Sequence, residues 1–192
     1  MPSSPPIADL LAQLARAFAR QGVRWFLFGA QAAILHGASR LTADVDVTVE
    51  VPEGSLSTLL ATLAGRGFAA RIANAEAFAE RTRVVPLVHE RSGIPVDLVL
   101  AGPGLEERFF TRIETYEVES VRVPVASAED MVVMKILAGR EKDRADAAAI
   151  LAARAKSLDL AYVRGTLRAL EEALDRRDLL PALEALVGAV GR

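Results

Sequence analysis

A strand, a glycine turn, a helix and a second strand follow one another early in the chain, and this order constrains the fold most. Residues 24–28 read RWFLF, a short β-type run, and Gly29 leads into AQAAILHG (30–37), which has the apolar spacing of a two-turn helix. The run DVDVTVEV (44–51) predicts the next strand. Two aspartates interrupt this run, which otherwise has the composition of a buried strand.

These aspartates are Asp44 and Asp46. Side chains alternate along a strand, so both carboxylates project from one face, while Val45, Val47 and Val49 point into the core. Two like charges side by side raise each other's pKa unless a cation lies between them. Mg²⁺ is the expected ion, with Mn²⁺ as an alternative, because it takes one or two carboxylates together with water and substrate phosphates.

A third acid, Asp97, stands in a similar apolar run, IPVDLVL. If strand 94–100 pairs beside strand 44–50, three carboxylates converge, and such a group can hold two metal ions for in-line phosphoryl transfer. Gly29 can supply a seat for the phosphates, since a helix that starts after a glycine turn presents free backbone N–H groups. Simpler interpretations also stand: the aspartate pair can face solvent on an edge strand, and Asp97 can cap a turn or pair with an arginine.

The rest of the chain divides into a β-rich part and a helical part. Helices are predicted at 7–21 and 54–66, a weaker strand at 67–72, a hairpin over 83–100 and a further strand region at 115–126. Pro86 and Pro95 predict that one hairpin strand is an edge or starts at its proline. From Ser127, which opens a capping box with Asp130, the pattern is helical to the end. We therefore expect an α+β fold, with a small mixed sheet flanked by helices in a core of residues 1–126, and a helical C-terminal region, 127–192, packed on that core.

Composition limits the function. The 192 residues suffice for one domain with a helical extension, and the absence of cysteine excludes disulfides and thiolate zinc sites. A formal net charge of −2 gives no overall sign of a nucleic-acid binder. The sequence has neither the pattern of a signal peptide nor an apolar run that would span a membrane, so we expect a cytoplasmic protein without a membrane partner.

The order FLFGA, helix, DVDV and later VDLVL resembles the nucleotidyltransferase superfamily, which includes DNA polymerase β and kanamycin nucleotidyltransferase. The segments HGASRLTADVDV and SAEDMVVMKILAGREKDRAD are more narrowly similar to the AbiEii-like group, the toxin half of bacterial toxin–antitoxin pairs. The resemblance covers roughly residues 20–150. It implies a nucleotidyltransferase core that binds an NTP, such as ATP, with a divalent metal.

The resemblance also implies roles for single residues. Asp44, Asp46 and Asp97 match the metal-binding catalytic acids, and Gly29 with Ala30 matches the Gly-Ser turn that holds the triphosphate. Ala30 departs from the pattern, because it lacks the serine hydroxyl. The further nucleotide-binding candidates are Arg40, Thr42, Lys135, Arg140, Lys142 and Asp143, the last four from a basic and acidic motif that continues to Asp146. Each has a structural alternative: Thr42 can order a turn, Arg40 can pair with an acid, and Asp143 with Asp146 can favour a helix dipole.

The function implied is Mg²⁺-dependent transfer of a nucleoside monophosphate from an NTP to a hydroxyl of RNA, such as a tRNA 3′ end, or of a protein, with an antitoxin as a partner. Two alternatives remain open. One is a catalytically silent nucleotide- or partner-binding domain, suggested by Ala30. The other is a small-molecule nucleotidyltransferase of the aminoglycoside type.

Overall fold

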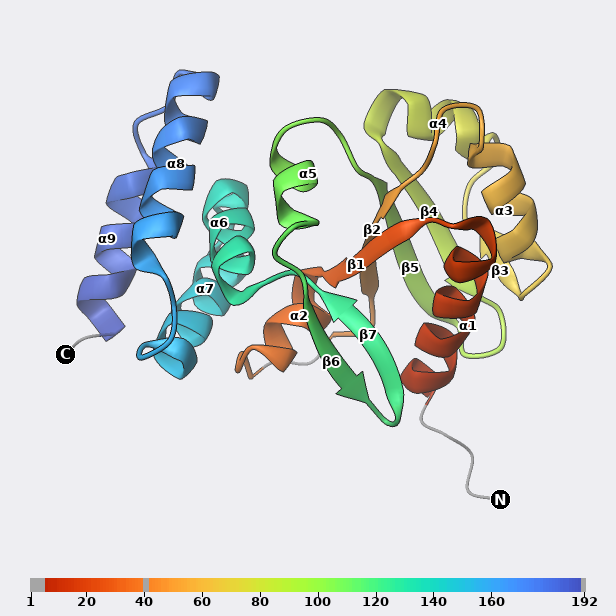
Figure 1. Cartoon of the computed structure of the whole chain (residues 1–192), viewed down its shortest axis with the longest axis horizontal. Helices are drawn as coiled ribbons and strands as arrows, with labels where there is room; N and C mark the ends of the chain where they lie inside the picture. Colours follow the sequence, from red (N-terminus) through yellow and green to blue (C-terminus); the bar gives the residue numbers. More distant parts are fainter. Residues whose placement is uncertain (1–5, 40–41, 191–192) are drawn as a thin grey trace. The chain divides into compact units, whose positions relative to one another are not determined.

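The computed structural model describes residues 6–39 and 42–190, and within these ranges the chain forms nine helices and seven strands (Figure 1). The helices are α1 (Pro6–Gln21), α2 (Gly29–Leu35), α3 (Leu56–Ala64), α4 (Ala75–Thr82), α5 (Leu105–Phe109), α6 (Ala128–Ala138), α7 (Glu141–Arg154), α8 (Leu160–Leu174) and α9 (Leu179–Val190). The strands are β1 (Arg24–Phe28), β2 (Val45–Glu50), β3 (Phe68–Ala70), β4 (Val84–His89), β5 (Ile94–Leu100), β6 (Glu114–Val118) and β7 (Val121–Val125). In the described part, no helix has the length and apolar character needed to cross a membrane.

All seven strands form one mixed sheet in the order β3-β4-β5-β2-β1-β7-β6. Strands β2 and β5 pair in parallel, as do β1 and β7, and the other neighbours are antiparallel. The predicted α+β class, with a mixed sheet flanked by helices, is confirmed. The structure also confirms the hairpin over 83–100 and the strand at 67–72, and it resolves 115–126 into the hairpin of β6 and β7.

Contacts divide the chain into two units. The described residues 6–31 and 42–126 form the first unit, which holds the whole sheet, and 32–39 with 127–190 form the second, which holds α6 to α9. The first residues of α2 thus belong to the sheet unit and its remainder to the helical unit. A simple division into 1–126 and 127–192 differs from this grouping, because it leaves α2 undivided in the first part.

One face of the sheet carries the main core of the first unit. Val45, Val47 and Val49 are fully buried, as expected from the alternation in this strand. Helix α1 packs on the same face, where Phe18 meets Trp25 with ring centroids 5.3 Å apart. The predicted inward orientation of the three valines is confirmed.

The opposite face is covered in its middle by α5. Phe26 and Thr48 are register partners of β1 and β2 on this face, and Phe26 packs edge-on against Phe109 and Phe110. Residues 101–104 connect β5 directly to this helix. Helix α5 covers the Phe26–Thr48 row, whereas the next row of the same face, which holds Phe28, Asp46 and Asp97, remains partly open.

Strand β2 and helix α4 differ from the prediction. Strand β2 begins at Val45 rather than at residue 44, so Asp44 precedes the strand. Helix α4 has no counterpart in the prediction, and it lies between Asn74 and Arg83, which both adopt positive φ angles, 54° and 60°. Its sequence, AEAFAERT, has no continuous apolar stripe, so it gives a weak helical pattern.

The two prolines of the β4–β5 hairpin lie at positions where the backbone N–H that proline lacks would have no strand partner. Pro86 O accepts a hydrogen bond from Arg71 N (2.9 Å), one residue after β3 ends. The N and O atoms of a strand residue point to the same side, so the absent N–H of Pro86 faces the place where β3 has stopped. Pro95 is the second residue of β5. Strand β4 is therefore an edge from Val84 to Pro86, where β3 no longer runs beside it.

His89 makes the stability of the first unit depend on pH. Its ring is buried, with Nδ1 2.8 Å from Ser92 Oγ and Nε2 3.1 Å from Gln13 Nε2. Burial lowers the pKa of His89 below 6.5, with Asp9 opposing this shift. The unfolded chain therefore binds more protons than the folded one below pH 6.5, and stability falls as the pH decreases from 6.5 through the folded pKa.

We expect wild type to lose more stability between pH 7.5 and pH 5.5 than the His89→Gln variant loses. Urea unfolding of both proteins at the two pH values measures this difference. Parallel losses in the two proteins would contradict a buried neutral His89.

Candidate active site

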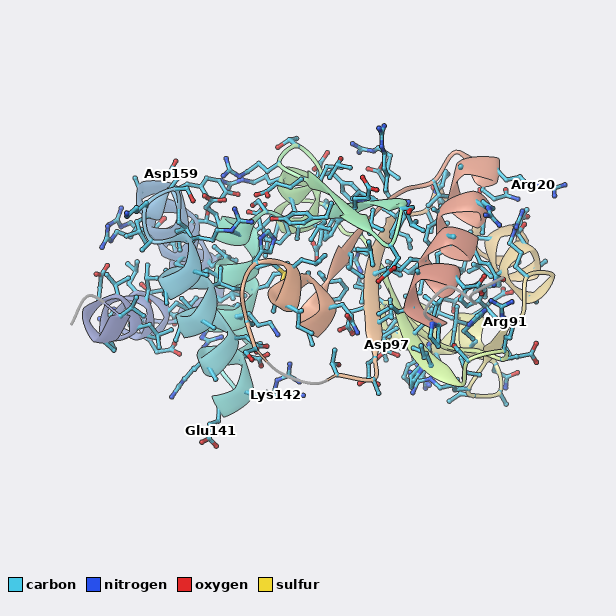
Figure 2. The ribbon with its side chains drawn as sticks, turned by 90° about the horizontal axis from the view of Figure 1, so that it is seen from below. Arg20, Arg91, Asp97, Glu141, Lys142 and Asp159 are labelled. Carbon is cyan, nitrogen blue, oxygen red and sulfur yellow. The ribbon has the colours of Figure 1, made fainter. Side chains whose placement is uncertain are left out.

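Asp46 and Asp97 lie side by side in the sheet. They are register partners in the parallel pair β2–β5, so the pairing expected between the two acidic strands is confirmed. Laterally paired residues project from the same face, and neighbouring strands are about 5 Å apart. The two carboxylates therefore share the open row beside α5. Figure 2 labels Asp97 at its place on the sheet.

Gly29 borders this pair directly. It follows Phe28, which is the register partner of Asp46 in the antiparallel pair β1–β2. Its φ is +69°, and a Cβ atom at this position would lie 1.9 Å from Asp46 Oδ2. Only glycine combines this backbone conformation with so close an approach of a carboxylate. The glycine turn and the acid are thus parts of one arrangement, and Ala30 follows as a buried residue of α2.

Gly29→Ala is expected to destabilise the protein by about 1–3 kcal/mol, because it adds a steric overlap with Asp46 to the cost of a positive φ. Gly93→Ala is a matched control: Gly93 has the same φ of +69°, but no atom lies within 4 Å of the position that its Cβ atom would take. Urea unfolding should show a clearly larger loss for Gly29→Ala than for Gly93→Ala. Equal losses would mean that the Asp46 side chain moves aside without cost.

Arg71 is the residue at this site that the sequence did not reveal. It directly follows β3, and its Nη2 forms an ion pair with Asp97 Oδ1. Both side chains remain partly exposed, 37% for Arg71 and 39% for Asp97. The simple possibility that Asp97 pairs with an arginine is therefore realised in this structure.

The other candidates near the acids are less closely joined. Asp44 is exposed and precedes β2, and its backbone N donates to Thr42 Oγ1 at 3.3 Å, so Thr42 orders the turn. Arg40 lies outside the described residues. Within 6–39 and 42–190, no three acidic or histidine side chains form a group that could hold a metal ion. The structure thus joins two of the three proposed acids directly and leaves Asp44 at the start of the strand.

Asp46 and Asp97 nevertheless fit a divalent cation. Two neighbouring carboxylates are the protein ligands that Mg²⁺ commonly takes when phosphate oxygens and water complete its octahedron. The open row leaves room for such ligands, because both side chains retain partial exposure.

The later basic and acidic motif forms an ion-pair cluster within the second unit. Lys135 Nζ lies 3.1 Å from Asp143 Oδ1 and 2.7 Å from Asp146 Oδ2, and all three residues are buried. Arg140 also pairs with Asp143. Burial acts to raise the pKa of Asp143, but its bonds to Arg140 and Lys135 prevail and hold the pKa below 3.8. This arrangement joins α6 to α7.

Lys142 differs from these residues, because it is exposed on α7, next to Glu141 at the start of the helix (Figure 2). The proposed nucleotide contacts of Lys135, Arg140, Lys142 and Asp143 remain predictions. The sequence spacing revealed that Asp143 and Asp146 share a helix face, but not that both turn toward Lys135.

Most of the chain matches one known protein family. Residues 7–178 match the family described as "Nucleotidyltransferase of unknown function (DUF6036)". No curated protein gives a significant match.

Three similar solved structures share the fold. The antibiotic-resistance factor ANT(2'')-Ia has a TM-score of 0.58 at 12% identity, over 88% of this chain and 95% of the other. An antigenic nucleotidyltransferase-like protein from Paracoccidioides brasiliensis has a TM-score of 0.54 at 17% identity, over 94% of each chain. The lincosamide antibiotic adenylyltransferase LnuA, with lincomycin bound, has a TM-score of 0.51 at 14% identity, over 74% of this chain and 94% of the other.

Proposed function

Because this chain belongs to the DUF6036 family of nucleotidyltransferases, we propose that it transfers a nucleoside monophosphate from an NTP to an acceptor hydroxyl with the help of Mg²⁺. The observation that carries this proposal is the pairing of Asp46 with Asp97 beside the Gly29 turn. Nucleotidyl transfer needs carboxylates for a metal and a nearby place for phosphates, and these residues supply both kinds of group.

In the proposed reaction, the acceptor oxygen attacks the α-phosphorus of the NTP, and the bond from that phosphorus to the bridging oxygen breaks as pyrophosphate leaves. Asp97 accepts the proton of the acceptor hydroxyl. Asp46 and Asp97 would hold the metal, with Asp44 as a further ligand, and Mg²⁺, or Mn²⁺ in its place, would supply positive charge to the phosphates. The backbone N–H groups at Gly29 and Ala30 bind phosphate oxygens. The proposal does not depend on Lys135, whose ammonium group already contacts two carboxylates.

For the acceptor, we favour a small-molecule hydroxyl. One similar structure is named a lincosamide antibiotic adenylyltransferase and another an antibiotic-resistance factor, which supports this class and ATP as the donor. A net charge of −2 gives no electrostatic support for a polyanionic acceptor. The second candidate is an RNA or protein hydroxyl, with a cognate antitoxin, and it rests on the AbiEii-like resemblance of residues 36–47 and 127–146.

Label transfer from the four NTPs, each labelled at its α-phosphate, tests the proposal. The protein is incubated with Mg²⁺ or Mn²⁺ and three separate acceptor pools: aminoglycosides and lincosamides, total tRNA, and cell proteins. Label in the first pool supports the favoured acceptor, and label in tRNA or protein supports the toxin candidate. The catalytically silent domain would be favoured if no pool receives label but an NTP still binds, which is seen as thermal stabilisation of the protein. An NTP at about 100 times its Kd should raise the free energy of unfolding by about 2.7 kcal/mol.

A further inference from the structure

Arg71 belongs to the same row of the sheet as the two acids. The register pairs Ala70 with Leu87, so Arg71 stands opposite Pro86, and Pro86 is in turn the partner of Asp97. Asp97 is the partner of Asp46. Residues that pair laterally share a face, so Pro86, Asp97 and Asp46 form one line across β4, β5 and β2, and Arg71 continues this line just beyond the end of β3.

The length of arginine and the shape of proline explain the ion pair. Two strand spacings, about 10 Å, separate the backbones of Arg71 and Asp97. The Arg71 backbone is held by its hydrogen bond to Pro86 O, and its guanidinium reaches Asp97 Oδ1 on the far side of β4. Pro86 carries a compact ring between them, over which a long side chain can pass.

This contact conflicts with metal binding at the same oxygen. A guanidinium is always charged and only donates hydrogen bonds, so it stays cationic beside Oδ1 and repels a second cation bound to the same carboxylate. The pair is partly exposed on both sides, and ion pairs of this kind are weak and break readily. A divalent cation at Asp97 therefore binds more weakly while Arg71 stays in place, or it displaces Arg71 at a modest cost.

We propose that Arg71 is the resident counter-cation of Asp97 in the metal-free protein, and that it competes with the divalent metal for this carboxylate. Arg71 is then a positioning residue that lowers metal affinity and keeps Asp97 oriented along the row. The inference rests on the metal site of the proposed function, but it concerns binding of the ion alone.

Mn²⁺ titration without nucleotide, followed by electron paramagnetic resonance of the free ion, tests this competition. Arg71→Gln should raise Mn²⁺ affinity about two- to fivefold, which corresponds to about 0.4–1 kcal/mol. Arg81→Gln removes the same charge from the exposed surface of α4 and should leave the affinity unchanged. Arg71→Met, which keeps much of the aliphatic stem, replaces Arg71→Gln if the latter does not fold.

A double-mutant cycle separates direct competition from a general charge effect. In the Asp97→Asn background, Arg71→Gln should no longer change Mn²⁺ affinity. Three results would each overturn the inference. They are equal Mn²⁺ affinity in wild type and Arg71→Gln, a rise in Mn²⁺ affinity that Arg71→Gln still causes in the Asp97→Asn background, and no Mn²⁺ binding by wild type or Arg71→Gln. If the protein transfers label but Arg71→Gln leaves Mn²⁺ affinity unchanged, only this inference is wrong. If Arg71→Gln raises Mn²⁺ affinity but the protein transfers no label, only the proposed function is wrong.

Discussion

Replacing Asp46 with asparagine is expected to reduce nucleotidyl transfer by about 10²–10³-fold, the loss typical of removing one group that stabilises transition-state charge. Asparagine has nearly the same shape, so it can keep the packing against Gly29, but it cannot balance a divalent cation. The fold should remain as stable as wild type, because removing one of two neighbouring carboxylates relieves repulsion. The measurement is kcat/KM for label transfer, together with urea unfolding of the same preparation.

Glu53→Gln is the control for this substitution, since Glu53 is an exposed acid of the same unit outside the row. It should transfer label at the wild-type rate. Asp97→Asn should resemble Asp46→Asn, because the two carboxylates are register partners. An Asp46→Asn protein with full activity would exclude the acid pair as the catalytic centre.

Replacing Lys135 with methionine is expected to destabilise the protein by about 3–5 kcal/mol, the range for breaking a buried ion pair on one side. The change leaves Asp143 and Asp146 buried without the ammonium that contacts both. Lys142→Met on the exposed surface of α7 removes the same charge and should change stability by less than about 0.5 kcal/mol. Urea unfolding at pH 7 compares the two variants.

Two further results sharpen this test. Adding Asp143→Asn and Asp146→Asn to Lys135→Met should recover part of the loss, because no buried charge then remains uncompensated and Arg140 is exposed to water. The low pKa of Asp143 also contributes stability that is present above pH 3.8 and lost as the pH falls through the folded pKa, and Lys135→Met should reduce this contribution. Intact stability with lost NTP binding would instead support the nucleotide-facing role predicted for Lys135.

The strands were predictable where the local apolar pattern and the turn-forming residues agreed. RWFLF is apolar, β-type and closed by Gly29, and the strand was predicted with its observed bounds. Strand β2 was predicted one residue too long at each end, because alternation alone cannot show that pairing begins at Val45. Helix α4 was not predicted, since its mixture of alanine and charged residues lacks an apolar stripe.

The site was predictable as a set of acids but not as a set of contacts. Apolar flanks identify Asp46 and Asp97 as unusual, and their pairing followed from one assumption about strand order. The role of Arg71 depends on the register of β3, β4 and β5 together, which no local pattern encodes. The same limit applies to Lys135, whose carboxylate partners lie on the next helix, beyond the turn at Gly139.

The division of α2 between the two units bears on how this protein can be recombined with its relatives. Residues 32–39 are grouped with the C-terminal helices, and Gly37 approaches α7 so closely that a Cβ atom there would lie 2.4 Å from Ala153 Cβ. A chimera joined at residue 126 would therefore combine helices α6 to α9 of one relative with a foreign 32–39 segment. A transplant that includes this early segment, with glycine kept at position 37, transfers the helical unit intact.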